Sequence, residues 1–545
     1  MAAWWTRVTR LRPLSLLLRA APPGFARVAG TGTRSRSWTE TRAETRALRW
    51  AHGSVAPVAA PVAAPRGAEH SRSPDELTGP SFFTIIYWVL CRNNNAHLLQ
   101  VECKNRYGPM WKSKFGPYMV ISVADADLIE QVIRQEGKYP IRFDMKNWTD
   151  YRDLRGYAYG PFTENGSKWN QLRSVLNQKM LRPRDMVAYV KPINEVVTDL
   201  LARLHMLSAS NGGMVNNLAN EFYKFAFEGI STVLFEKRLG CLEQSVPEET
   251  QVFIDAVRTV FIHSEKMALI PKWIRMILPL WKHYCNAWDV IFSFGMKEID
   301  KKMIKISEMV ARGEPLEGEY LTYLLSNGKL TEHEIHGSIA ELLMAGIDTT
   351  SNTMSWVLYH LSREPHLQER LHQEVEGVCP GNTIPNVQDL AKMSFLKAVI
   401  KEILRLYPVV PSNSRLIVEG GTKVGGYVFP KNTLFQLCHY AVSHNPEIFP
   451  DPEAFKPERW LRKGTMLAHP PFGSIPFGFG VRACVGRRVA ELEMYLTLSR
   501  LIKEFEVQWD PSQKDILPKT STVIIPSESI NLKFIARKVQ QNRPD

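Results

Sequence analysis

Several long stretches of the chain place apolar residues three and four positions apart, which is the spacing of one face of an α-helix. The pattern runs through residues 194–207, 299–310 and 331–361. Stretches of this kind dominate the chain after its first 80 residues. We therefore expect a body built mostly from helices.

Extended segments are fewer and shorter. Residues 119–123 and 423–429 are rich in valine, isoleucine and aromatic side chains, which favour strands. A late pair of strands is expected around Val523 and over residues 530–534. The predicted fold class is thus mainly α with small β-sheets in one large domain.

Two apolar segments are too short to cross a membrane, which takes about 20 residues. Residues 81–91 are almost entirely apolar, and residues 269–284 mix tryptophan, leucine and basic side chains. Such mixtures are typical of helices that lie in a lipid headgroup layer, although core packing explains them about as often. We expect a peripheral contact with a membrane.

The net charge of +13 is concentrated at the N-terminus. Residues 1–73 contain twelve arginines, no lysine and three glutamates, and so carry nine of those charges. An arginine-rich, Ser/Thr-bearing segment without acidic residues before Glu40 is typical of a mitochondrial transit peptide, with simple disorder as the alternative. We predict a transit peptide over 1–40, a transit or linker region over 41–74 and a folded domain over 75–540. Nucleic-acid binding is not expected.

The seven cysteines are scattered, and no two of them form a C-x-x-C pair. This spacing argues against a zinc site and against the disulfide framework of a secreted protein. It favours a reducing compartment.

The stretch from Phe477 to Gly486 reads F-G-F-G-V-R-A-C-V-G and frames Cys484 as a candidate ligand of haem iron. A thiolate ligand pushes electron density onto the iron and favours O–O cleavage. Arg482 is placed to reach an anionic haem propionate. Glycines let the loop turn tightly beside a flat macrocycle, and backbone N–H groups there can point at the sulfur.

Within the predicted helix 331–361, Ala345-Gly-Ile-Asp-Thr-Thr350 puts an acid and two hydroxyls among apolar residues. Gly346 lacks a side chain and would let a small ligand approach the backbone. Thr349 can bond back to a carbonyl one turn earlier and distort the helix. Opposite a haem, Thr349 would hold the oxygen species and Asp348 would relay protons. A kinked core helix is the alternative.

Other polar residues are candidates for holding the haem and its loop. Glu402 and Arg405 share a helix face, and with Arg459 they could form a buried network beneath the cysteine loop. Trp169 and Arg173, four residues apart, can both donate to haem propionates, as can Arg415. For each arginine alone, a surface position is the alternative.

In order along the chain, these motifs read W-x-x-x-R, A-G-x-D-T-T, E-x-x-R, F-x-P-E-R-W and F-x-x-G-x-R-x-C-x-G. Together they resemble the cytochromes P-450 over roughly residues 75–540. The resemblance implies the fold of that family, haem b (iron protoporphyrin IX) and a monooxygenase that puts one oxygen atom of O2 into its substrate. It also implies that Phe477 belongs to the haem-binding loop. A haem sensor or carrier without turnover is the alternative from another class, and the Asp348–Thr349 pair disfavours it.

The chain has no flavin or nicotinamide domain, so electrons must come from another protein. Lys397 and Lys401 lie one turn apart, and Arg487 and Arg488 directly follow the cysteine loop. A basic cluster here would steer an acidic partner, with solvated side chains as the alternative. These motifs resemble the mitochondrial branch, which implies a ferredoxin (adrenodoxin) with its NADPH-dependent reductase and a place on the matrix side of the inner membrane.

At finer grain, the chain resembles the vertebrate family-27 enzymes, above all those that hydroxylate the side chain of cholesterol-derived sterols at C26/C27. Residues 518–532 are instead closer to a vitamin D hydroxylase of the same family, so a vitamin D or retinoid substrate is the alternative. A sterol or secosteroid requires an apolar pocket with few polar anchors. We expect its lining near Met344, Val409, Val410 and residues 523–525.

Overall fold

The computed structural model describes residues 72–91, 95–115, 118–315, 318–461 and 469–537. The predicted transit peptide over 1–40 lies outside these residues, as does all but the last three residues of the 41–74 region. Both assignments, and the domain boundaries at 75 and 540, therefore stay predictions.

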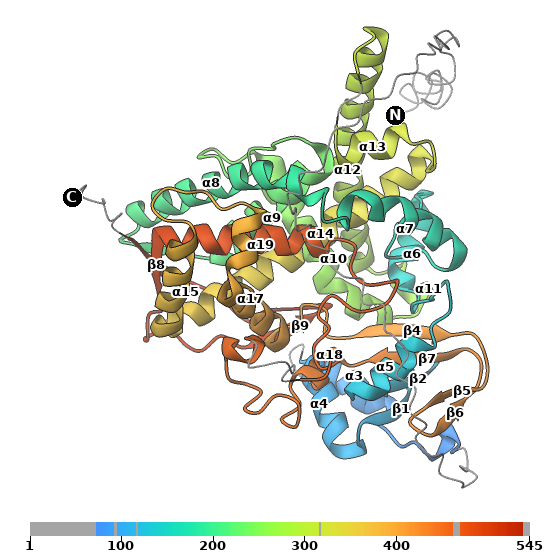
Figure 1. Cartoon of the computed structure of the whole chain (residues 1–545). Coiled ribbons are helices and arrows are strands. Elements are labelled where there is room, and N and C mark those ends of the chain that lie inside the picture. The colour runs from blue at the N-terminus through green and yellow to red at the C-terminus, as the bar shows by residue number, and fades with distance from the viewer. Residues whose placement is uncertain (1–71, 92–94, 116–117, 316–317, 462–468, 538–545) are drawn as a thin grey trace, which may run out of the picture. The chain divides into compact units, whose positions relative to one another are not determined.

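Helices form most of the described chain (Figure 1). The α-helices are α3 (Phe82–Cys91), α4 (Ala96–Tyr107), α5 (Ala126–Arg134), α6 (Lys146–Arg155), α7 (Gly166–Met180), α8 (Met186–Ser210), α9 (Leu218–Phe235), α10 (Glu248–Leu269), α11 (Lys272–Arg275), α12 (Pro279–Ala311), α13 (Tyr320–Ser326), α14 (Glu332–Arg363), α15 (Pro365–Val378), α16 (Val387–Lys392), α17 (Ser394–Leu406), α18 (His439–Ser443) and α19 (Arg487–Glu504). Two short 3₁₀ helices are η1 (Pro74–Glu76) and η2 (Pro457–Trp460).

The strands form four small sheets. A four-stranded sheet has the order β1 (Met110–Phe115), β2 (Tyr118–Val123), β7 (Thr433–Leu437), β4 (Asn413–Ile417), with only the β2–β7 pair parallel. A three-stranded sheet has the order β3 (Met214–Val215), β11 (Leu532–Ala536), β8 (Phe505–Gln508). Two hairpins join β5 (Thr422–Val424) to β6 (Tyr427–Phe429) and β9 (Pro518–Ser521) to β10 (Val523–Pro526).

The predicted fold class is confirmed. The three stretches with helical spacing lie within α8, α12 and α14, and the extended segments lie in β2, the β5–β6 hairpin, β10 and β11. The two late strands do not pair with each other, however. β10 pairs with its hairpin partner β9, whereas β11 pairs with β8 and β3.

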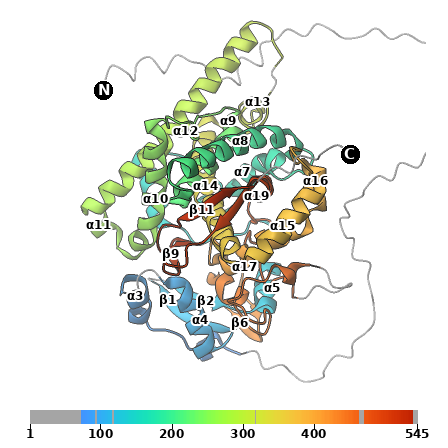
Figure 2. The same cartoon turned by 90° about the vertical axis from the view of Figure 1, so that its left-hand side faces the viewer.

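The centre of the helical body is α14, which packs most extensively against α9. Its start is fixed by a capping box, in which the Thr331 side chain accepts from the Glu334 backbone and the Glu334 carboxylate accepts from the Thr331 backbone. Almost every side chain of α9 is buried, so α9 is an interior layer between α14 and the helices around it. In Figure 2, α14 lies in the middle of the helical body, between α10 and α19.

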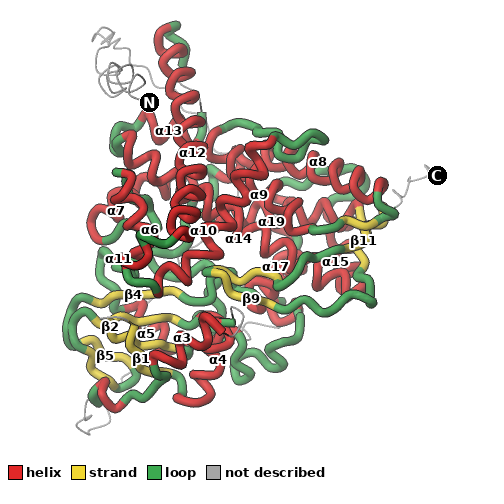
Figure 3. The backbone as a smooth tube through the Cα atoms, turned by 180° about the vertical axis from the view of Figure 1, so that it is seen from behind, coloured by secondary structure: helices red, strands yellow, loops and turns green. Residues whose placement is uncertain are grey.

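The four-stranded sheet and the β5–β6 hairpin lie beside this helical body rather than within it (Figure 3). They enclose a separate apolar cluster with α5, which includes Ile121, Ile129 and Phe435. The β9–β10 hairpin contacts α10 and α14 of the helical body and also α4, which packs against β1, and so bridges the two regions. No helix of the described residues has the length and apolar character needed to span a membrane.

Candidate active site

The loop before α19 presents Cys484 on a tightly turned backbone. The Cys484 N–H donates to the carbonyl of Phe477 at 2.8 Å, which closes the loop. Gly478 and Gly480 have φ values of 70° and 78°, a region that side chains disfavour. A Cβ on Gly480 would also lie 2.1 Å from the carboxylate of Glu136. Gly486, with φ −85°, begins α19 in a conformation open to any residue, so a tight turn does not explain this glycine.

The Cys484 side chain is exposed to an internal cavity, with protein on its other sides. Burial raises the pKa of the Cys484 thiol, because the charged form loses water. The N–H of Gly486 and the guanidinium groups of Arg173, Arg142 and Arg487 act on that pKa in the opposite direction. The loop therefore supplies the backbone donor to sulfur that its glycine pattern predicts.

The cavity above Cys484 has a volume of about 220 Å³ and lies between the loop and α14. Ala345 and Thr349 form its α14 wall, and Phe477, Arg482 and Cys484 form the facing wall. The Thr349 hydroxyl donates to the Ala345 carbonyl at 2.8 Å, as the sequence predicts. The structure thus brings the A-G-x-D-T-T motif and the cysteine loop to one cavity, although 135 residues separate Thr349 from Cys484.

Asp348 does not line this cavity in the described structure. Its carboxylate is buried and accepts from the hydroxyl of Tyr223 on α9, whose oxygen also accepts from Asn352 at 3.1 Å. Burial raises the pKa of Asp348 to about 6, although the Tyr223 bond and Arg258 oppose the shift. Tyr223 is a functional candidate that the sequence analysis missed, because nothing in its local sequence marks it.

The structure requires a glycine at position 346 for a different reason from the one expected. A Cβ at this position would lie 2.8 Å from the side chain of Ile230 on α9. The missing side chain therefore lets α14 approach α9 closely. The backbone of Gly346 does lie on the cavity wall, but its Cβ direction points to the neighbouring helix.

Three arginines converge on the cavity without an acidic partner. Arg142, Arg173 and Arg482 all line it, and none of them forms an ion pair among the described residues. Arg482 is buried and donates to the carbonyls of Pro140 and Glu164 at 2.8 and 2.9 Å. Burial and the neighbouring arginines lower the pKa of Arg482 to about 8.

Arg142 is a site residue that sequence reasoning missed. It donates to the Arg482 carbonyl at 2.8 Å, and burial lowers its pKa to about 9, with Arg415 and Arg173 adding to the shift. Its loop, 139–145, carries no spacing that marks a cofactor site. Its proximity to Arg482 exists only in the folded chain.

Trp169 and Arg415 lie behind the cavity wall. The Trp169 ring lies under the Arg482 guanidinium, 4.5 Å from ring centroid to charge, and its buried indole N–H has no partner among the described atoms. Arg415 forms a buried ion pair with Glu136 and donates to the Phe479 carbonyl at 3.3 Å. Arg415 is thus already neutralised, whereas Arg142, Arg173 and Arg482 are not.

These residues fit a haem. A buried surplus of guanidinium charge is costly unless an anion compensates it, and haem propionates are such anions. The unpartnered N–H groups of Trp169 and of the Nε atoms of Arg142 and Arg482 are further donors for them. The sulfur of Cys484 faces the same cavity as an iron ligand would require.

Glu402, Arg405 and Arg459 form one buried network. Arg405 makes two bonds to the Glu402 carboxylate, at 2.7 and 2.9 Å, and Arg459 reaches the same carboxylate at 3.2 Å. Trp460 donates its indole N–H to Glu402 at 2.8 Å. Arg405 also donates to the Pro452 carbonyl at 2.7 Å, so the network fastens α17 to the segment that leads into the cysteine loop.

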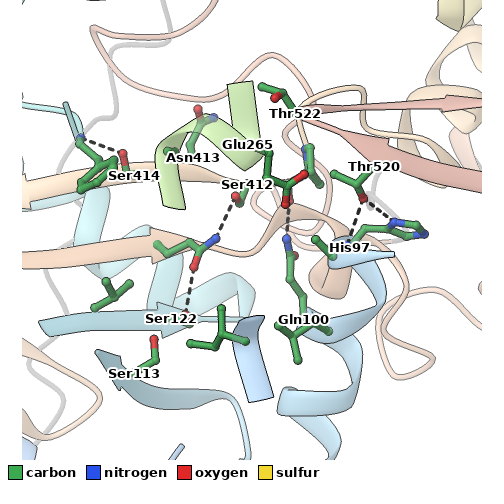
Figure 4. A pocket seen from close by; sticks show the side chains of 18 of the residues that line it. His97, Gln100, Ser113, Ser122, Glu265, Ser412, Asn413, Ser414, Thr520 and Thr522 are labelled. Atoms are coloured by element: carbon green, nitrogen blue, oxygen red, sulfur yellow. Dashed lines mark hydrogen bonds between the residues drawn. The ribbon is translucent and has the colours of Figure 1, made fainter. Parts of the chain in front are cut away.

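A second, larger cavity of about 440 Å³ adjoins the first. Both cavities are lined by Arg142, Phe162, Val410 and Asn413. Figure 4 shows the polar side chains around it, which come from α4, α10 and the strands of the two neighbouring sheets.

The expected substrate lining is right in one part and wrong in another. Val409 and Val410 line the cavity above Cys484, but Met344 and residues 523–525 line neither cavity. Met344 and Val523 pack in the core instead. The β9–β10 hairpin presents Thr520, on β9, and Thr522, at its tip, to the larger cavity instead.

The basic residues near the loop lie on two adjacent helices. Lys397 and Lys401 are on α17, and Arg487 and Arg488 begin α19. Lys401, Arg487 and Arg488 are exposed, whereas Lys397 is half-buried. Arg487 pairs with Glu491 at 2.9 Å. Burial and then Lys401 lower the pKa of Lys397, and Glu491 opposes them, which shows that the two helices adjoin here.

Comparison with known proteins agrees with this geometry. Residues 76–534 match the family described as cytochrome P450. The chain belongs to the cytochrome P450 family. Among its relatives is the mitochondrial sterol 26-hydroxylase of Mus musculus, 47% identical over 479 residues, or 86% of this chain and 90% of that protein. The Homo sapiens sterol 26-hydroxylase is 48% identical over 451 residues, or 81% and 85%. The Homo sapiens 25-hydroxyvitamin D-1 alpha hydroxylase is 42% identical over 478 residues, or 86% and 93%.

As a cytochrome P450, this chain is a monooxygenase and its cofactor is haem. The expectations of family, fold class, cofactor and enzyme class are therefore confirmed. The roles of individual residues rest on the geometry above.

Proposed function

We propose that this cytochrome P450 hydroxylates the side chain of cholesterol-derived sterols at the C26/C27 end, in mitochondria. The observation that carries the proposal is that the two cavities adjoin and share wall residues, and together they suit a long, rigid and mostly apolar molecule. Relatives that share 47–48% of their residues with this chain are named sterol 26-hydroxylases. Those relatives are also named mitochondrial, which agrees with the predicted transit peptide.

Haem bound at Cys484 would activate O2 for insertion into an unactivated C–H bond. Cys484 would supply the thiolate that holds the haem iron, and Arg142, Arg173, Arg482 and Trp169 would bind the propionates. Thr349 faces the same cavity and would place its hydroxyl beside the reacting oxygen. Asp348, on the other face of α14, would exchange protons through Tyr223.

Electrons would come from a mitochondrial ferredoxin that an NADPH-dependent reductase reduces. Lys401, Arg487 and Arg488 form an exposed basic surface on α17 and α19, next to the loop that carries Cys484. Such a surface favours an acidic electron donor. Lys397, half-buried beside them, would add to the positive potential.

We also propose a peripheral position on the matrix side of the inner mitochondrial membrane. Phe83 of α3 is 81% exposed, and Trp273 of α11 is 73% exposed. Aromatic side chains of this kind bind at a lipid interface. The wall of the larger cavity includes Ile85 of α3 and Leu269 at the end of α10, so an apolar substrate could enter from the lipid near these side chains.

A vitamin D hydroxylase is the second candidate, because residues 518–532 resemble that branch and place Thr520 and Thr522 on the larger cavity. The deciding experiment is turnover with adrenodoxin and its reductase, with a cholestane triol and vitamin D3 in competition. Mass spectrometry identifies the products. Terminal side-chain oxidation of the triol as the main product supports the proposal. Preferential oxidation of vitamin D3 overturns the sterol assignment and leaves the monooxygenase intact.

A further inference from the structure

Glu265 is an acidic side chain on the wall of the larger cavity, and none of the roles above uses it. It lies in the last turns of α10, whose end at Leu269 also lines the cavity. Figure 4 shows its side chain leaving the helix toward the pocket, close to the hairpin that carries Thr520 and Thr522. An acid on a mostly apolar wall requires a reason, because burying a charge is costly.

Two polar neighbours in the cavity, His97 and Gln100, each bond to protein, while the Nε2 of His97 has no partner among the described atoms. The ring Nδ1 of His97 lies 2.6 Å from the Thr520 hydroxyl. The Gln100 amide donates to the Pro411 carbonyl at 3.3 Å. Burial lowers the pKa of His97 to about 4, so this ring is neutral and offers Glu265 no positive charge.

Glu265 is in a different position, because it forms no ion pair among the described residues. The backbone N–H of Thr522, at the tip of the β9–β10 hairpin, lies close enough to the Glu265 carboxylate to lower its pKa. Thr522 has a φ of 65°, and its hydroxyl donates to the Phe261 carbonyl of α10 at 2.9 Å, which holds the hairpin tip against the helix. A carboxylate has about four acceptor sites, so acceptor capacity is left on the cavity side.

The pKa of Glu265 agrees with this environment. Burial raises it to about 7, while the Thr522 N–H and Lys266 oppose the shift. A hydroxyl that donated to this carboxylate would replace part of the lost hydration. The site therefore favours a ligand that brings its own donor.

The position of Glu265 fits one end of a sterol. Arg142, Phe162, Val410 and Asn413 line both cavities, so a molecule whose tail lies beside Thr349 can extend through them into the larger cavity. The ring hydroxyl of a sterol lies at the end opposite its side chain. It would therefore lie in the cavity that Glu265 lines.

We propose that Glu265 accepts a hydrogen bond from the ring hydroxyl of the substrate and so fixes which end of the molecule reaches the haem. The inference rests on the proposed sterol function and adds its specificity-determining residue. The contact orients the substrate and takes no part in the oxidation itself.

The test measures dissociation constants of the haem-loaded enzyme from the spectral change on ligand binding. The ligands are cholestan-3-ol, its 3-methyl ether and cholestane, which share one side chain. Because a hydrogen bond to a charged group is strong, we expect the wild type to bind the alcohol roughly ten- to a hundred-fold more tightly than the ether. Glu265→Leu should bring this ratio close to one, and it removes a half-buried carboxylate that forms no ion pair among the described residues.

Glu265→Gln keeps an uncharged acceptor and should lower the ratio several-fold, since charge-assisted bonds are about twice as strong. Glu249→Gln removes a carboxylate from the exposed start of the same helix and should leave the ratio unchanged. Equal affinity of the wild type for alcohol and ether, or an unchanged ratio in both Glu265 variants, overturns the inference alone. A wild type that binds none of the three ligands overturns the proposed sterol function, and this inference with it.

Discussion

Asp348 and Thr349 are adjacent in the sequence, yet their side chains leave α14 toward different partners. Thr349 bonds to the Ala345 carbonyl and lines the cavity that contains Cys484. Asp348 is buried against α9 and accepts from the hydroxyl of Tyr223. The helix thus lies between a reaction cavity and a buried acid, and the two residues can be tested separately.

Thr349→Ala should uncouple electron consumption from hydroxylation. The variant loses the hydroxyl on the cavity wall, so more of the consumed O2 should leave as peroxide while haem binding is unaffected. We expect the ratio of product to NADPH to fall several-fold. Ser355→Ala is a matched control, because the Ser355 hydroxyl likewise bonds to a carbonyl one turn earlier, that of Ser351 at 2.8 Å, but lines neither cavity. Equal coupling in the Thr349 variant and the wild type would contradict the proposed role.

Asp348→Asn should stabilise the protein at neutral pH. The pKa of Asp348 is about 6 in the folded state, above its ordinary value of 3.8, so folding favours the protonated form. Its stabilising contribution is fully present below pH 3.8 and is lost as the pH rises through 6. Between pH 4.5 and 7.5 the free energy of unfolding of the wild type should fall by about 2 kcal/mol relative to that of the asparagine variant. Urea unfolding at both pH values measures this difference, and a difference independent of pH would refute it.

Glu402→Ala should be strongly destabilising. The change leaves the fully buried guanidinium of Arg405 without its carboxylate partner, which costs about 3–5 kcal/mol of unfolding free energy. Glu458→Ala is the control, since it breaks an exposed pair with Arg370 worth at most about 1 kcal/mol. The free energy of unfolding in urea distinguishes them. Similar losses in the two variants would show that the network does not stabilise the loop segment.

Reversing the charge at Arg488 should weaken the interaction with the electron donor. Arg488→Glu is expected to raise the KM for adrenodoxin several-fold at low salt, with a smaller effect at high salt, because screening weakens exposed charges. Lys305→Glu makes the same charge change on the exposed surface of α12 and should leave the KM unchanged. Equal effects of both variants would exclude a specific docking surface at α19.

Local motifs carried most of what the sequence could predict about the site. Cys484, Arg482 and Thr349 belong to short patterns whose spacing reflects one loop or one helix, and all three line one cavity. The helical spacing of residues 331–361 likewise predicted α14. In each case the physical constraint acts within about ten residues.

Contacts between distant segments could not be predicted in this way. Arg142, on a loop, lines both cavities, and Glu265, near a helix end, lines the larger one. Neither segment has a distinctive spacing in the sequence. The packing of Gly346 against Ile230 also appears only once α9 lies on α14. Residues 523–525 were expected to line the substrate pocket, but the hairpin turns Thr520 and Thr522 toward it, while Val523 packs in the core.

The identity of the haem ligand is the claim on which the account depends most directly. It is tested by the absorption spectrum of the ferrous carbon monoxide complex in the wild type, Cys484→Ser and Cys285→Ser. A thiolate ligand gives a red-shifted band, which we expect in the wild type and in the Cys285 variant, whose thiol lies on α12 and lines neither cavity. Cys484→Ser is expected to lack this band. Its persistence in Cys484→Ser would contradict the assignment of the site.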